Sequence, residues 1–137
     1  MAQQSIRLEI VTPEKYVVKQ DVKIVMAPGT EGEFGILPNH TPFLSSLETG
    51  TVHYRDLQDK EHFVFISGGF SEALPDRVTI LAETAEIREK IDIDRARAAF
   101  ERAQKRLSSS EEGIDKDRAR RAMDRAMARI KLFGIKE

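Results

Sequence analysis

The spacing of apolar residues changes once along this 137-residue chain, near residues 84–91. Before that point apolar and polar residues alternate in short runs such as residues 5–11, which is the period of a half-buried β-strand. From residue 92 onward apolar residues recur every three or four positions, which is the period of an amphipathic helix. We therefore predict an α+β protein, with a β domain over residues 1–84 and a helical region over residues 85–137.

Glycine, proline and charge are divided at the same place. All five prolines lie at or before Pro75, and only Gly113 and Gly134 follow residue 85. The first 85 residues hold 7 basic and 12 acidic side chains, a balance of −5, and the remaining 52 hold 15 and 11, a balance of +4. Dense turn signals between short strands favour an antiparallel β-sandwich or a flattened barrel. The nearly continuous apolar run over residues 63–66 predicts a strand that is covered on both faces.

The helical region contains two apolar stripes that are rich in alanine. One runs from Ala96 to Leu107 and the other from Ala119 to Ile130, with a polar break at residues 108–113. Asp92 and Asp115 are suitable N-caps for the two helices. This pattern predicts an antiparallel two-helix hairpin that buries little apolar area and is therefore weakly held.

Several classes of protein find no support in the residues. There is no cysteine, which excludes disulfides and thiolate metal sites, and no apolar run reaches the roughly 18 residues of a membrane span. The N-terminus does not resemble a signal peptide, so we expect a soluble chain inside a cell. The three histidines lack metal-ligand spacing and no nucleophile signature is found, so we expect neither a metal site nor catalysis. Gly29, Gly32 and Gly35 are better explained as turn residues than as a phosphate-binding loop, because no Lys-Ser/Thr pair or helix follows them.

Arginines gather beside the seam of the predicted hairpin. At about 100° per residue, those of the second helix occupy one narrow arc, and antiparallel packing places Arg95 and Arg129 at nearly the same level, with Asp92 and Arg125 at the same open end. Unpaired guanidinium groups favour a bound anion such as a phosphate chain. A solvated charged face and an acidic protein partner are alternatives. Nucleic acid is a poorer partner, because acidic residues are interleaved and no aromatic platform accompanies the arginines. The arginines on this arc and beside the seam are Arg118, Arg121, Arg125 and Arg129 on the second helix and Arg95, Arg102 and Arg106 on the first.

The order of four motifs resembles the epsilon subunit of F-type ATP synthases, over almost the whole chain. The motifs lie at residues 8–14, 31–42, 66–72 and 78–84, and the block EGEFGILPNHTP with the later SGG is the most specific part. The resemblance implies a sandwich of about ten strands and a regulatory C-terminal hairpin in the central rotor stalk. Its implied partners are the gamma subunit, the ring of proton-carrying membrane subunits and, when the hairpin extends, the catalytic alpha/beta hexamer. The implied location is peripheral, at the cytoplasmic face of the cell membrane, and the implied role is non-catalytic.

Some bacterial members of that family bind ATP as a regulatory ligand through a motif Ile/Leu-Asp-x-x-Arg-Ala, which residues 91–96 match in full. Whether magnesium accompanies the ATP stays open. Glu33 and His40 are implied to lie near the contacts with gamma and the membrane ring, although turn formation explains His40 equally well. A free-standing nucleotide sensor is the competing function. The ATP-binding residues that the resemblance implies are Glu83, Ile91, Asp92, Arg95, Ala96, Arg102, Arg125 and Arg129.

Overall fold

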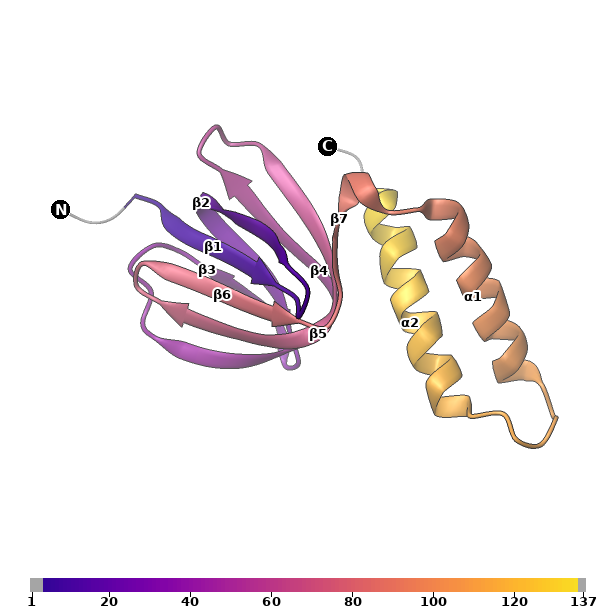
Figure 1. Cartoon of the computed structure of the whole chain (residues 1–137). Coiled ribbons are helices and arrows are strands. Elements are labelled where there is room, and N and C mark those ends of the chain that lie inside the picture. Colours follow the sequence, from indigo (N-terminus) through magenta and orange to yellow (C-terminus); the bar gives the residue numbers. More distant parts are fainter. Residues whose placement is uncertain (1–3, 136–137) are drawn as a thin grey trace.

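The computed structural model describes residues 4–135 and places a β-sandwich beside a two-helix hairpin (Figure 1). The predicted α+β architecture is confirmed. The elements are β1 (Ile6–Val11), β2 (Tyr16–Gly29), β3 (Gly32–Ile36), β4 (Phe43–Asp56), β5 (Glu61–Leu74), β6 (Arg77–Ala82), β7 (Ala85–Ile87), the 3-10 turn η1 (Arg88–Lys90), α1 (Ile93–Ser108) and α2 (Lys116–Phe133).

Within the described residues the sandwich has seven strands rather than about ten, because three of them are long. β2, β4 and β5 contain 14 residues each. They change partners along their length: β2 pairs first with β1 and then with β3, and β5 pairs with β7 in its first half and with β6 in its second. If each of the three long strands is counted as two segments, the total is ten. The predicted and observed strand counts therefore differ only in whether a long, bent strand is counted once or twice.

One strand pair departs from the antiparallel expectation. The strands β1, β6, β5, β4 and β2 form a closed ring, in which β1 pairs with both β6 and β2. Four of the five pairings in this ring are antiparallel, and β1–β6 is parallel. A closed ring with an odd number of strands cannot alternate direction throughout, so one parallel pair is required.

The two faces of β5 belong to different cores. Val64 and Ile66 are fully buried inside the sandwich with the apolar residues of β1, β2 and β6. Phe65, which is fully buried, and Phe63, 9% exposed, face the hairpin and pack with Ile91 and Leu132. The prediction of a strand covered on both faces is confirmed.

The hairpin has the predicted helices and caps. The Oδ1 atoms of Asp92 and Asp115 accept hydrogen bonds from the backbone N–H of Arg95 and Arg118, each at 3.0 Å. The seam is made of small residues, since the buried side chains of α1 are both alanine. α2 packs on β4 and β5, whereas α1 lies on the outer side of α2 (Figure 1). None of the described helices is both long and apolar enough to cross a membrane.

β7 continues the sheet beyond residue 84, since its three residues pair with β5. The following turn η1 leads to Ile91, which is buried against the sheet. Residues 85–91 therefore form a strap, which holds the base of the hairpin to the sandwich.

The bend in β5 requires glycine at residue 69. Gly69 has φ +137°, and a Cβ atom there would overlap the backbone carbonyl oxygen of Leu81. We expect Gly69→Ala to destabilise the protein by more than about 3 kcal/mol, measured by urea unfolding with circular dichroism. Gly32→Ala is the control: its φ of +125° is also unfavourable, but no atom lies within 4 Å of the added Cβ. An equal loss in both variants would contradict the steric argument.

Candidate functional site

A cavity of about 330 Å³ lies where the strap meets both helices, and we call it the arginine cavity. It contains five of the predicted ATP-binding residues, Asp92, Arg95, Ala96, Arg102 and Arg129, together with Glu86, Lys90 and Ala99. Its walls come from β7, η1, α1 and α2. The cavity therefore exists only while the hairpin is packed against the strap.

Helix geometry places three of these residues. Asp92 begins α1 and uses Oδ1 as the N-cap acceptor, which leaves Oδ2 available to other groups. Arg95 and Arg102 follow on one face of α1, because seven residues make close to two turns. Neither side chain has a hydrogen-bond or ion-pair partner within residues 4–135, and both are exposed. These two guanidinium groups can therefore accept an anion without losing an internal contact.

Arg129, on α2, already has an ion-pair partner within the protein. Its Nε donates to Oε1 of Glu86 at 2.7 Å, and its Cζ lies 4.2 Å from the ring centroid of Phe65. The side chains of Arg129 and Glu86 are only 23% and 32% exposed, so this ion pair is partly shielded from water. The cavity holds four basic and two acidic side chains, a balance of +2. This excess of positive charge favours an anionic ligand.

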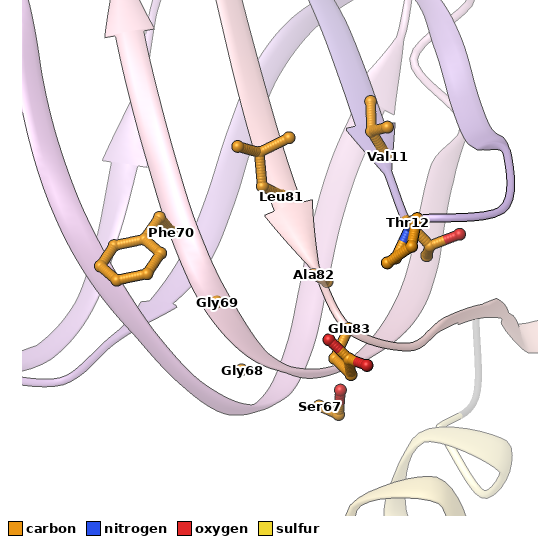
Figure 2. A pocket seen from close by; sticks show the side chains of 10 residues that line it. Val11, Thr12, Ser67, Gly68, Gly69, Phe70, Leu81, Ala82 and Glu83 are labelled. Atoms are coloured by element: carbon orange, nitrogen blue, oxygen red, sulfur yellow. The ribbon is translucent and has the colours of Figure 1, made fainter.

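Sequence reasoning missed Glu86 and placed Glu83 in this site instead. Glu83 lines a different cavity of about 540 Å³ on the sandwich, between the ends of β1 and β6 and the middle of β5 (Figure 2). The residue after it, Thr84, is tied to Ser67 by a backbone N–H to Oγ hydrogen bond of 2.9 Å, which keeps Glu83 at that edge. Glu86 instead lies opposite Phe65 in the β5–β7 pair, directly beneath α2. Only the strand pairing reveals this position.

Two other predicted residues also lie outside the cavity lining. Ile91 is 6% exposed and packs with Phe63, Phe65 and Leu132, so it anchors the strap. Arg125 is half-buried on α2, one turn before Arg129. The structure thus gives Ile91 a packing role and leaves the predicted role of Arg125 in ATP binding untested.

Apolar side chains line the cavity that contains Glu83 and continue beyond it on β4. Phe70 and Leu81 lie opposite each other across β5 and β6 and are 62% and 52% exposed. Val11 lies beside Leu81 on β1, and Leu44 on β4 is 76% exposed (Figure 2 shows the first three). We call Val11, Leu44, Phe70 and Leu81 the apolar face. A patch of this kind is characteristic of a protein–protein contact.

Glu33 and His40 occupy separate places in the sandwich. Glu33 lies on β3 with Oε2 3.4 Å from Nε2 of His53. His40 follows β3, its Nδ1 lies 2.7 Å from the carbonyl oxygen of Thr41, and its ring lies 5.0 Å from that of Phe43. These contacts support a local role for His40 in the loop, and the contacts of both residues with other subunits stay predictions.

The polar residues His62, Asp56 and Tyr54 form a further group, whose role is structural. Nε2 of His62 hydrogen-bonds Oδ2 of Asp56 at 2.8 Å, and the His62 ring stacks on Tyr54 with centroids 4.8 Å apart. The hydrogen bond from His62 lowers the pKa of Asp56. Burial raises the pKa of Tyr54 to about 12, and the charges of Glu89 and Asp56 act in the same direction. Residues 4–135 contain no cluster of three or more possible metal ligands.

The two domains define a class of ATP synthase subunit. Residues 5–88 match the family described as ATP synthase, Delta/Epsilon chain, beta-sandwich domain, and residues 89–134 match the corresponding long alpha-helix domain. The ATP synthase epsilon chain of Desulfosudis oleivorans is 61% identical over 106 residues, covering 77% of this chain and 80% of the relative. That of Syntrophobacter fumaroxidans is 51% identical over 129 residues, covering 94% and 96%.

A solved structure has the same fold. A chain in the cryo-EM structure of the Euglena gracilis mitochondrial ATP synthase, OSCP/F1/c-ring in rotational state 1, has a TM-score of 0.82 and 22% identity, covering 93% of this chain and 81% of its own. With the matches above, the protein belongs to the ATP synthase epsilon chain family. It is thus a non-catalytic subunit of that complex.

Burial of Tyr54 predicts a loss of stability at alkaline pH. Since the folded pKa of about 12 lies above the unfolded value of 10.0, the phenol contributes stability below pH 10 that is lost as the pH rises through 12. We expect Tyr54→Phe to lose about 1–2 kcal/mol less free energy of unfolding between pH 10 and 12 than the wild type, measured by urea unfolding. The exposed Tyr16→Phe is the control. If both variants follow the wild-type curve, the assignment to Tyr54 is wrong.

Proposed function

We propose that this epsilon chain is a regulatory subunit of the central stalk, whose hairpin binds ATP in the arginine cavity while it is docked on the sandwich. The observation that carries the proposal is the cavity itself, where Arg95, Arg102 and Lys90 surround a space with excess positive charge. The phosphate chain would accept hydrogen bonds from Arg95 and Arg102, which have no internal partners within residues 4–135. The match to the family's ATP-binding motif at residues 91–96 supports the same ligand.

Glu86 gives the site a way to respond to ligand. In the absence of ATP its carboxylate neutralises Arg129 at 2.7 Å. A phosphate group entering the cavity would compete for the same guanidinium. A ligand that binds only the docked state stabilises that state by its binding free energy. High ATP would therefore hold the hairpin down, and low ATP would free it to extend toward the catalytic alpha/beta hexamer. The side chains of the site, with a balance of +2, offset only part of the negative charge of ATP, so magnesium is a variable of the binding experiment below.

The sandwich would supply the attachment to the rotor. The apolar face is suited to burial against the gamma subunit, and Glu33 and His40 lie on β3 and the loop after it, which would contact the ring of proton-carrying membrane subunits. The protein would then lie peripherally at the cytoplasmic face of the cell membrane. The second candidate, a free-standing nucleotide sensor, predicts the same cavity but no function for the apolar face.

The arginines of α1 test the ATP site. We expect Arg95→Ala or Arg102→Ala to weaken ATP binding by about tenfold or more, because each removes a charge-assisted hydrogen bond. Isothermal titration of the whole chain, with and without magnesium, measures the change. The control is Arg120→Ala, since Arg120 is 63% exposed and pairs with Asp117 at 3.7 Å outside the cavity. Unchanged affinity in both cavity variants would exclude this site.

The apolar face tests the place in the rotor. We expect Phe70→Ser to reduce stoichiometric co-purification with gamma and the catalytic hexamer at least severalfold, because it removes a large contact side chain. Its exposure predicts little change in the urea midpoint of the free chain. Leu57→Ser, at a site 45% exposed in the β4–β5 turn, is the matched control. A wild-type chain that fails to co-purify would favour the sensor, and an unaffected Phe70→Ser would refute the docking face.

A further inference from the structure

Arg88 joins the strap to the C-terminal end of α2. It is the first residue of η1, and its Nη2 donates hydrogen bonds to the carbonyl oxygens of Ile135 and, at 3.5 Å, Phe133. Phe133 is the last residue of α2, so these acceptors lie at the helix C-terminus, 45 and 47 residues along the chain from Arg88. A single side chain thus bridges two segments that lie far apart in the sequence, beside the Arg129–Glu86 ion pair and the packing of Ile91 on Leu132.

The chemistry of this contact suits arginine. The last carbonyl groups of a helix lack partners within the helix and carry its negative dipole end, so a cation there is stabilising. The guanidinium also lies over the ring of Phe63, with Cζ 5.6 Å from the centroid. A planar group can cover an aromatic ring and donate to carbonyls at its edge, which an ammonium group does less well. Arg88 is therefore held by charge, hydrogen bonds and stacking together.

The remaining contact between hairpin and sandwich is small. Within residues 4–135 the buried cluster between them consists of Phe63, Phe65, Ile91 and Leu132, with Ala128 and Ile135 packed against it. The Arg129 side chain adds its ion pair with Glu86 and its contact with the Phe65 ring. The helix–helix seam is alanine-rich and cannot add to the attachment, since α1 lies outside α2. Arg88 and Arg129 are therefore two charged, partly shielded contacts beside a small apolar cluster, and loss of either should weaken the docking of α2.

We propose that Arg88 is a clasp that sets how firmly the hairpin docks on the sandwich when no nucleotide is present. Arg88 does not line the arginine cavity, so the clasp is separate from the proposed ATP site and does not depend on it. Breaking it releases α2 as a unit from β4 and β5, while the sandwich stays folded around its own core.

The test uses the full chain, whose natural sequence has no cysteine. Ala128→Cys places one thiol on the side of α2 that packs against the buried cluster, about one turn before Leu132. The labelling rate of this thiol by a maleimide, without nucleotide, reports how often α2 leaves the sheet. We expect labelling about tenfold faster when Arg88→Ala is added, and an unchanged rate when Arg97→Ala is added on the exposed face of α1.

Further measurements separate undocking from unfolding and from local fraying. Urea unfolding of the sandwich strands should be unchanged in Arg88→Ala. Spin labels at Glu31→Cys and Ser110→Cys, in an otherwise unsubstituted chain, should show a larger share of long distances once Arg88→Ala is present, because residue 110 lies in the hairpin turn away from the clasp. Arg88→Lys should label nearly as fast as Arg88→Ala. Wild-type labelling in Arg88→Ala, equal acceleration by Arg97→Ala, or wild-type labelling in Arg88→Lys would each overturn the proposal.

Discussion

Burial of β5 on both faces is the constraint on which the helical half of the molecule depends. Val64 and Ile66 fix the strand in the sandwich core, and the alternation of side chains then forces Phe63 and Phe65 to the opposite face. Exposure of two phenylalanine side chains to water would cost free energy in proportion to their apolar area, so the strap and α2 must cover them. The position of the hairpin is thus a consequence of strand register rather than of helix–helix affinity.

An arginine side chain lies over the ring of each of these phenylalanines, Arg88 over Phe63 and Arg129 over Phe65. The two arginines connect the strap and α2 in opposite directions. Arg88 reaches from the strap to the carbonyl end of α2, while Arg129 reaches from α2 back to Glu86 in the strap. Both guanidinium groups lie over aromatic rings, where the charge is partly shielded from solvent. The arrangement explains how α2 keeps one orientation on the sheet: the polar contacts with fixed geometry specify its position, and the small apolar cluster supplies the driving force.

Much of this was predictable from the sequence. The period change predicted a β region followed by helices, although β7 continues the sheet past residue 84. Asp92 and Asp115 were found as caps because capping depends on local residues alone. The parallel β1–β6 pair was not predicted, because it follows from closure of a five-strand ring and not from any local signal. Glu86 was missed for a similar reason, and Glu83 lies outside the arginine cavity: strand pairing decides which carboxylate faces α2. A helical projection placed Arg125 beside Arg129. The rotation of α2 about its own axis, which decides which of its side chains face the cavity, is fixed by the packing of Leu132 on Phe63 and Phe65.

The hairpin is attached at one end, and this makes it a lever. Its fixed points lie at the strap and at the last turn of α2, whereas the turn at residues 109–115 is at the opposite end (Figure 1). An 18-residue helix is about 27 Å long. A rotation of only ~10° about the strap would therefore move the turn by about 5 Å, given a rise of 1.5 Å per residue. Small rearrangements around Arg88 and Ile91, on the scale of a rotamer change, are amplified at the far tip into displacements large enough to make or break contact with a neighbouring subunit.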